Sequence, residues 1–468
     1  MTIQKILLRQ KTRLLDSDVE TAIGLFLGRI GTGDGILLES AEIDGRWGRY
    51  SLAAGDFLLQ AHCCEGRLAL TINDPRLSGL AELDGLPYLE GLRELMAAIG
   101  LEPDSAAEEF PPIARALYGY LGYEAAGLLE PRLAAALPVG QAEGVFSLPG
   151  TVYLFDHSYN QLAEISLTGK AGSTGAGIKT ASPAAVGQVK SSFSRESYLA
   201  AVRDVQEYIC QGQATRVVLS NRFSAAFSGS LFDVYRRLRR IDPSPYMFFQ
   251  RLGGFELAVS SPEVLVSCDR GRLRLCPAAG SRPRGRDLSE DDLFEEELHS
   301  NPGEQAAHAL LVDAARGDLG RVATPGSVRV DRFMEVERFA SIMRLTSRLS
   351  AQLEDGLDAV DIMRAAFPGG TVSGSPKIRA MEILAKKEPV PRGPYGGALG
   401  WLGLDKTAVN LDLGLTVRAL WARGGQIFWQ TGAGLVYDSK PERQWRECQE
   451  QANPALEALS PFLTKNLI

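Results

Sequence analysis

The chain has 468 residues, of which 45% are hydrophobic and 23% are charged, and its formal net charge at pH 7 is −7. These proportions are typical of a globular protein with a large core, and the acidic balance argues against a nucleic-acid partner, which needs a basic surface. Because no apolar run approaches the ~20 residues that span a bilayer and residues 1–15 lack signal-peptide features, we expect a cytoplasmic protein without membrane contact.

Residues 1–166 form the first region that the sequence predicts. It contains strand-like segments rich in β-branched and aromatic residues, namely GILLES (35–40), FLLQAHC (57–63) and TVYLFDH (151–157). The segment LEGLRELMAAIG (89–100) has a helical apolar period, with Gly100 as its expected C-cap. From 167 to 192 the chain is rich in Gly, Ala, Ser and Thr without an apolar period, which predicts a flexible linker.

The second predicted region, 193–462, opens with the helical segment 194–212, capped by Ser194 or Ser197 and ended by Gly212. Consecutive strands are expected in TRVVLSNRF (215–223), FELAVSS (255–261), EVLVSC (263–268) and RLRLC (272–276). Further helices are expected at 290–316, 335–353, 357–366, 376–387 and 440–458, and further strands at 396–403, 409–418 and 426–430. This order predicts an α+β fold with a large, mostly antiparallel sheet.

Several segments of the second region are suited to an anionic ligand. CPAAGSRPRG (276–285) places Ser281 directly before two arginines, and FPGGTVSGSPKIRAMEIL (367–384) is a Gly/Ser turn that leads into a helix N-terminus. Gly432 and Gly434 would let backbone N–H groups approach an anion, and Glu447 on the following helix could hold a cation. Taken singly, each of these features is equally typical of an ordinary turn or surface residue.

Taken together and in order, six segments resemble the chorismate-utilising enzymes, most closely anthranilate synthase component I. They are SSPEVLV (260–266), PAAGSRPRG (277–285), LLVDAARGDLGRV (310–322), PGGTVSGSPKIRAMEI (368–383), RGPYGGALGW (392–401) and TGAGLVYDSKPER (431–443). The resemblance implies a two-layer α/β sandwich with the chorismate site between packed sheets, and dependence on Mg²⁺. It also implies conversion of chorismate and ammonia to anthranilate and pyruvate in tryptophan biosynthesis, with ammonia from a glutamine amidotransferase subunit.

The resemblance also assigns roles to matching positions. Glu263 would be the general acid for the departing C4 hydroxyl of chorismate. Mg²⁺ would be held by Glu447 and, through a water, by Glu304. The residues expected to contact chorismate are Gly280, Ser281, Thr371, Tyr395, Arg418, Gly432, Ala433 and Gly434.

Two further segments are similar to those with which anthranilate synthases bind tryptophan as a feedback inhibitor. They are LLESAEIDGRWGRYS (37–51) and DPSPYMFF (242–249), and they would place Ser40, Pro245, Tyr246 and Met247 around tryptophan. The second segment is also compatible with a plain turn that enters an apolar strand, above all at Phe248 and Phe249.

The chain departs from the family pattern at five positions near the expected site. Ala307 replaces a metal-binding glutamate, Arg344 a histidine, Arg216 a glutamine, Gly317 an asparagine and Gln451 a lysine. Ala279 stands where aminodeoxychorismate synthases often carry a nucleophilic lysine, which disfavours that route. Three interpretations stay open: anthranilate synthase component I; a relative that makes 4-amino-4-deoxychorismate or 2-amino-2-deoxyisochorismate; and a non-catalytic homologue with a binding or regulatory role.

Overall fold

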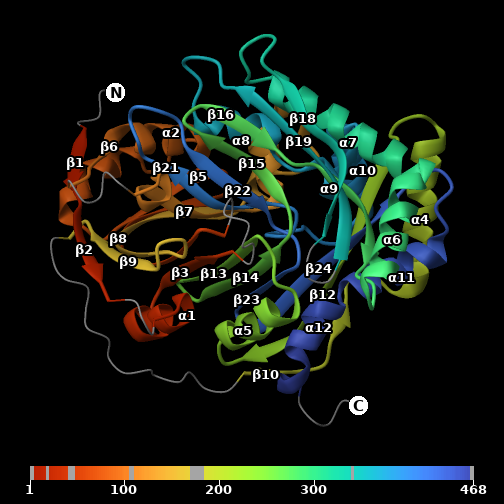
Figure 1. The fold of residues 1–468 in the computed structure, drawn as a ribbon, viewed down its shortest axis with the longest axis horizontal. Coiled ribbons are helices and arrows are strands. Elements are labelled where there is room, and N and C mark those ends of the chain that lie inside the picture. The colour runs from red at the N-terminus through yellow and green to blue at the C-terminus, as the bar shows by residue number, and fades with distance from the viewer. Residues whose placement is uncertain are drawn as a thin grey trace.

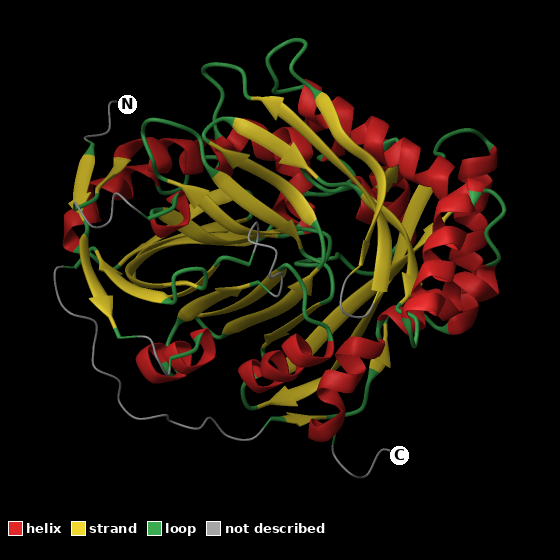
Figure 2. Ribbon diagram, viewed as in Figure 1, coloured by secondary structure: helices red, strands yellow, loops and turns green. Residues whose placement is uncertain are grey.

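The computed structural model describes residues 5–16, 20–40, 48–104, 110–168, 184–338 and 342–463. Its centre consists of β-strands arranged in two layers, with helices on the outside (Figures 1 and 2). Among the described strands, every pairing is antiparallel except that of β1 (Ile6–Arg9) with β6 (Ile99–Glu102). The α+β class and the mostly antiparallel sheet expected from the sequence are therefore confirmed.

The first layer combines strands from both halves of the chain. Its paired order is β2 (Lys11–Leu15), β9 (Gln161–Ser166), β8 (Gly144–Asp156), β4 (Tyr50–Cys64), β3 (Gly35–Glu39), β13 (Tyr246–Leu252), β14 (Phe255–Ser261), β23 (Ala419–Arg423), β24 (Gln426–Leu435) and β12 (Arg216–Ser228). Short strands β10 (Ala185–Val186), β11 (Lys190–Ser191) and β20 (Gly374–Ser375) pair with β12. The helices α1 (Ala22–Leu25), α5 (Leu231–Ile241) and α12 (Asn453–Leu459), with a π-helical turn at Phe26–Ile30, pack on its outer face.

The second layer has the paired order β5 (Arg67–Ile72), β4, β8, β7 (Ala116–Leu121), β21 (Ala398–Gly403), β22 (Leu411–Leu415), β15 (Val264–Asp269), β16 (Arg272–Leu275) and β19 (Ile342–Gln352). The strands β17 (Ala278–Pro283) and β18 (Arg329–Arg338) also pair with β19. Its outer face is covered by α2 (Tyr88–Ala98), α3 (Ala126–Leu129), α7 (Pro302–Gly320) and α8 (Ala359–Ala366).

The long strands β4 and β8 connect the two layers. The first half of β4 pairs with β3, whereas its second half pairs with β5. The register between β4 and β8 shifts between Phe57 and Leu59, and Asp56 has a positive φ of 54°. Such a bulge bends a strand pair sharply, so one hairpin serves both layers.

Alternation along β13 shows why the layers pack as they do. Met247 and Phe249 point into the core beneath α1 and α5, whereas Tyr246 and Phe248 point into the core between the layers. Because successive strand residues face opposite sides, a strand with two buried faces is apolar throughout.

The helices near the expected site pack on the ends of both layers. α4 (Arg195–Cys210), α10 (Lys377–Lys387) and α11 (Pro441–Gln451) cover β12 and β24, while α6 (Leu288–Ser300) lies against β17 (Figure 1). The short helix α9 (Gly370–Ser373) leads into β20. The helix expected to begin at Ser194 is confirmed, since the Ser194 hydroxyl accepts a hydrogen bond from the N–H of Ser197.

The expectation of a helix at 335–353 is wrong, because this stretch forms most of the β18–β19 hairpin. Its apolar side chains at 343, 345, 349 and 351 follow a two-residue period, and β19 pairs with β16, β17 and β18. Pairing with three strands outweighs the local helical pattern.

Three other boundaries differ from expectation. The single helix expected at 290–316 is two, because Asn301 caps α7 and Pro302 starts it. The helix expected at 440–458 is likewise divided at Ala452, with Pro454 in the first turn of α12. Gly100 is not a C-cap, since α2 ends at Ala98 and Gly100 pairs with Leu7 in β6.

The expected flexible linker, 167–192, falls partly outside the described residues. Residues 169–183 lie outside them, whereas β10 and β11 at 185–191 add to the edge of β12.

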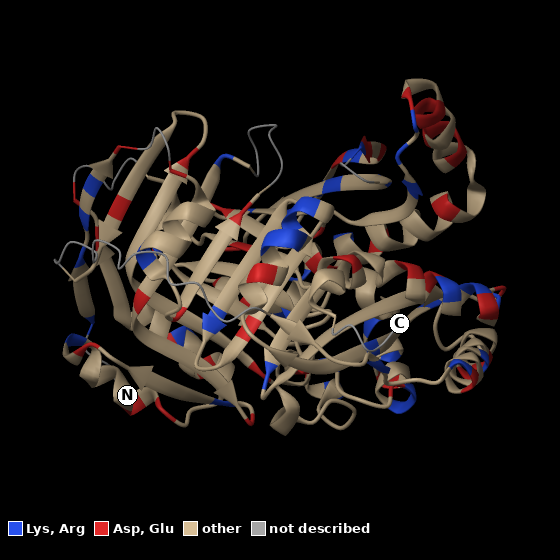
Figure 3. Cartoon of the chain, turned by 90° about the horizontal axis from the view of Figure 1, so that it is seen from below, with Lys and Arg blue, Asp and Glu red and all other residues tan. Residues whose placement is uncertain are grey.

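Lys and Arg are interspersed with Asp and Glu along the elements (Figure 3). No helix in the described ranges is both long and apolar enough to cross a membrane.

Candidate functional site

Glu263 lies between β14 and β15 and is buried. Its Oε1 accepts a hydrogen bond from the Thr371 hydroxyl at 2.5 Å, and its Oε2 lies 3.7 Å from Nη2 of Arg344. Burial raises the pKa of Glu263, against the opposing effects of Arg344 and Thr371. A carboxyl with a raised pKa keeps its proton to a higher pH, which suits a general acid.

The strand segment 432–434 lies close to two functional side chains. A Cβ on Gly432 would lie 2.9 Å from the Tyr395 hydroxyl, and a Cβ on Gly434 would lie 2.8 Å from Nη2 of Arg216. At both positions a side chain would crowd a neighbouring side chain, so glycine is suited to this close approach rather than to a turn. The segment pairs with β12 on one side, while β23 pairs with β24 only as far as Trp429, so its other edge has no strand partner among the described residues. We call Glu263, Thr371, Tyr395 and segment 432–434 the substrate side of the site.

Arg392 supports the substrate side and was not singled out from the sequence, although it begins the RGPYGGALGW segment. Its guanidinium forms an ion pair with Glu388 at 2.7 Å and donates to the carbonyls of Val372 and Val218, both at 2.7 Å. It also stacks on the ring of Tyr395 at 5.5 Å. The side chain is 1% exposed. Because Arg392 is buried and is bound at once to Glu388, Val372 and Val218, it holds the adjacent Tyr395 ring in position.

Gly280 and Ser281 lie on β17 beside Arg344 and Glu304. Gly280 has a φ of 69°, and a Cβ there would lie 2.7 Å from Oε2 of Glu304. Ser281 is opposite Arg344 in the β17–β19 pairing and is exposed. The structure thus places Gly280 next to the Glu304 carboxylate and Ser281 opposite Arg344.

Glu304 and Glu447 are the carboxylates that the family resemblance assigns to Mg²⁺. Oε1 of Glu304 lies 3.4 Å from Nη1 of Arg282. Burial raises the pKa of Glu447 most, Arg443 and Arg216 lower it, and Glu304 raises it, so these groups are close enough to interact. We call Arg216, Glu304, Ala307, Arg344 and Glu447 the cation side.

The cation side does not fit a Mg²⁺ ion. Ala307 offers no oxygen, Glu304 is engaged by Arg282, and the Arg216 guanidinium near Glu447 would repel a divalent cation. The described part of the chain contains no cluster of three or more Asp, Glu, His or Cys side chains suited to a metal ion.

Other cations expected to meet an anionic ligand have partners within the protein. Nη1 of Arg418 contacts both carboxylate oxygens of Asp242, at 2.6 and 2.7 Å. Arg284 is bound to Asp291, and Lys377 lies 2.9 Å from Asp318 at the start of α10. Sequence motifs did not indicate these partners, because the Arg418 and Asp242 positions are 176 residues apart.

The four residues expected around tryptophan lie in one part of the first layer. β3 pairs with β13 so that Glu39 faces Met247, which brings Ser40 next to segment 245–247. Pro245, Tyr246 and Met247 are buried, and the Tyr246 hydroxyl donates to Oδ1 of Asp412 at 2.6 Å. Burial raises the pKa of Asp412 to about 7.

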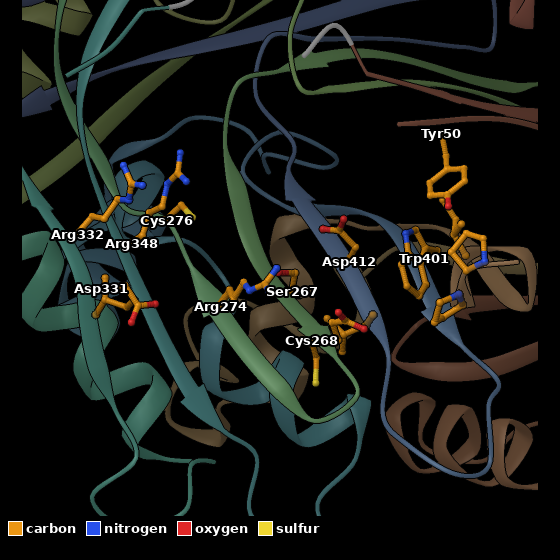
Figure 4. A pocket seen from close by; sticks show the side chains of 16 residues that line it. Tyr50, Ser267, Cys268, Arg274, Cys276, Asp331, Arg332, Arg348, Trp401 and Asp412 are labelled. Carbon is orange, nitrogen blue, oxygen red and sulfur yellow. The ribbon is translucent and has the colours of Figure 1, made fainter. Parts of the chain in front are cut away.

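Asp412 lines a cavity of about 630 Å³ that Glu263 does not line, although Cys276 lines both this cavity and the smaller one at Glu263. Figure 4 shows its labelled side chains extending from Tyr50 and Trp401, past Asp412, to Arg332 and Arg348. None of the residues assigned to chorismate lines it, whereas a cavity of about 40 Å³ adjoins Glu263 and Thr371. We place the chemistry at Glu263, because the buried acid and the glycine segment meet there.

Comparison with known proteins identifies the family of the chain. Residues 88–457 match the family model of chorismate binding enzymes. The chain is 33% identical over 487 residues to the anthranilate synthase component 1 of Acinetobacter calcoaceticus, covering 96% of this chain and 94% of that protein. It is also 33% identical over 438 residues to the aminodeoxychorismate synthase component 1 of Bacillus subtilis, covering 89% of this chain and 90% of that protein.

A solved structure is similar over nearly the whole chain. The anthranilate synthase component I of Streptococcus pneumoniae superposes with a TM-score of 0.72 at 26% identity, covering 95% of this chain and 99% of that one. The two curated relatives above carry different names at equal identity, so similarity alone does not choose between them. From the matched family model and the two nearly full-length relatives, we conclude that this chain belongs to the family of chorismate binding enzymes.

Proposed function

We propose that this chain is a component I enzyme of the anthranilate synthase type that aminates chorismate at C2. The observation that carries the proposal is Glu263, a buried carboxyl with a raised pKa, held by Thr371 on the substrate side. In the proposed reaction the C2–N bond forms as the C4–O bond breaks. Glu263 gives its proton to the departing hydroxyl, which leaves as water, and the incoming ammonia loses a proton.

The final product depends on the fate of the aminated ring. Anthranilate forms when the ring loses its C2 proton and the enolpyruvyl group leaves as pyruvate, and this step needs a base. Arg344 stands at the family's histidine position, and a guanidinium does not give up its proton in proteins. We therefore propose that the aminated product that retains the pyruvyl group, 2-amino-2-deoxyisochorismate, accumulates.

His308 does not make up for the missing histidine. Its Nε2 is hydrogen-bonded to the Ser347 hydroxyl at 2.7 Å, and the side chain is fully buried. Burial, reinforced by Arg344, lowers the pKa of His308 to about 4. A base with so low a pKa is a weak proton acceptor near neutral pH.

The test is a product analysis of the wild-type protein and the Arg344→His variant with chorismate and ammonium. We expect the wild-type product to carry the mass of the aminated, pyruvyl-retaining compound. In Arg344→His, pyruvate released per chorismate consumed should rise by about 10²-fold or more, because a positioned acid–base group is typically worth that factor. Equimolar anthranilate and pyruvate from the wild type would contradict the proposed product, and no turnover in either protein would favour the non-catalytic alternative.

We also propose that ammonia comes from a glutamine amidotransferase subunit, as the component 1 name of the relatives suggests. If so, ammonium alone should support turnover, whereas glutamine should do so only after the partner subunit is added. Turnover with glutamine and the isolated chain would contradict this proposal.

Tryptophan is proposed as an effector because Ser40 and segment 245–247 meet at the β3–β13 pair. A ligand that binds only the folded protein raises its melting temperature by mass action. We expect millimolar tryptophan to raise it by a few degrees, on the order of 1–2 kcal/mol of stabilisation, and Ser40→Phe to abolish the shift. An unchanged wild-type melting curve would assign this region a structural role only.

A further inference from the structure

Arg216 lies where the substrate side meets the cation side. It begins β12, and its guanidinium packs against the backbone of Gly434. Nη1 donates to the carbonyls of Gly370 and Thr371 at 3.4 and 3.5 Å, which are long distances for hydrogen bonds. Among the described residues no carboxylate lies within ion-pair distance of Arg216, although Glu263 and Glu447 are near enough to affect its pKa. Its charge is thus poorly compensated by the protein.

Arg344 is a second cation that is only loosely paired. Its Nη2 lies 3.7 Å from Glu263, which exceeds the length of a direct hydrogen bond, and the side chain is 16% exposed. Arg418 differs from both, because Asp242 holds it at 2.6 Å. Arg216 and Arg344 are therefore the arginines of the site whose charge is least compensated by the protein.

The departures from the family pattern have a consistent effect on charge. By the family resemblance, the arginines at 216 and 344 stand in place of a neutral glutamine and a histidine, the alanine at 307 in place of a glutamate, and the glutamine at 451 in place of a lysine. With the histidine neutral, these changes together add two positive charges to the site, which is the charge of one divalent cation. The same site lacks the oxygen at 307 that would help to hold such a cation.

We propose that Arg216 and Arg344 supply the positive charge that binds the carboxylates of the substrate, so that this site takes a cyclic dicarboxylate without a divalent cation. The inference rests on the proposed function, since it concerns the same chorismate site. Guanidinium groups bind carboxylates through two parallel N–H···O bonds, and the absence of a Cβ at Gly434 makes room for the Arg216 guanidinium, whose Nη2 would lie 2.8 Å from such an atom.

Calorimetric titration of the full chain with chorismate tests the inference, with ammonia left out so that no amination takes place. Protein freed of metal on a chelating resin is titrated once in EDTA and once in millimolar MgCl₂. We expect the two dissociation constants to agree within about twofold, because the cation is part of the chain. Binding that is about 10-fold or more weaker in EDTA would overturn the inference and leave the proposed function standing. Binding in neither buffer would overturn both.

Variants identify the residues responsible. Arg216→Gln and Arg344→Gln should each weaken binding in EDTA by about 10-fold or more, whereas Arg272→Gln, at an exposed position on β16, should not. Arg216→Gln combined with Ala307→Glu should regain affinity only when Mg²⁺ is present. Melting curves establish that each variant is folded. Wild-type affinity in folded Arg216→Gln and Arg344→Gln would overturn the inference.

Discussion

On the substrate side of the site, each functional position is fixed by close packing: Gly432 against the Tyr395 hydroxyl, and Thr371 bonded to Glu263. On the cation side, Ala307 and Arg344 depart from the family pattern, and the contacts of Arg216 and Arg344 are long. Removing a buried group that is packed or hydrogen-bonded is costly, and a buried charge without a close partner is costly as well. The two sides therefore differ in how closely their side chains are paired, tightly on the substrate side and loosely on the cation side.

Glu263→Gln is the strongest test of the substrate side. Glutamine keeps the oxygen that accepts the Thr371 hydrogen bond but has no proton to give, so amination should slow by about 10²–10⁴-fold. The measurement is chorismate consumption with ammonium. Chorismate affinity should change little, and a rate within about 10-fold of the wild type would show that Glu263 is not the acid.

Arg392→Leu tests whether the substrate side depends on the network behind it. It leaves Glu388, which is 7% exposed, without its cation, and removing one partner of a buried pair costs about 3–5 kcal/mol. Urea unfolding measures the loss. Arg379→Leu on α10 breaks the half-exposed pair with Glu382 and should cost less than about 1 kcal/mol. Equal losses of unfolding free energy in both variants would show that Arg392 does not support the substrate side more than an ordinary surface ion pair does.

The sequence predicted the parts of the structure that depend on local signals. Ser194 does cap α4, and strands were expected correctly in β12, β14, β15 and β16. The segment 335–353 was mistaken for a helix because its strand character depends on pairing with β16 and β17, which a local pattern does not contain.

Sequence motifs indicate candidate site residues but not their contacts. The glycines at 432 and 434 and the acid at 263 are indicated by motifs, and the structure places Gly432 against Tyr395 and Glu263 against Thr371. The pairing of Arg418 with Asp242 and the central position of Arg392 arise from packing between distant segments. Sequence spacing carries no information on such contacts.

Arg418→Ala examines a residue that lies close enough to Arg344 to affect its pKa. If Arg418 also grips a substrate carboxylate, chorismate affinity should fall by about 10-fold, or roughly 1.5 kcal/mol. Because Arg418 is paired with Asp242, Asp242→Asn serves as the matched control, which removes the ion pair but keeps the guanidinium. Calorimetry should show a loss in Arg418→Ala only. Equal losses in both variants would mean that Arg418 acts through the ion pair rather than on the substrate.

Asp412→Asn gives the smallest expected effect, at a cavity that Glu263 does not line. The folded protein holds the Asp412 proton with a pKa raised to about 7 by burial, above the usual value of 3.8, so the folded state binds this proton more tightly than the unfolded state does. The resulting stabilisation is complete below about pH 4 and is lost as the pH rises towards 7, by about 1 kcal/mol per pH unit. Asparagine still accepts the hydrogen bond from Tyr246 but does not ionise, so denaturant unfolding at pH 5, 6 and 7 should show a shallower decline in stability than the wild type. Asp313→Asn, at an exposed position on α7, should leave the decline unchanged. If Asp412→Asn also left it unchanged, the proton would not be held at Asp412, and the chorismate site could be tested at any pH in this range without a contribution from the cavity residue.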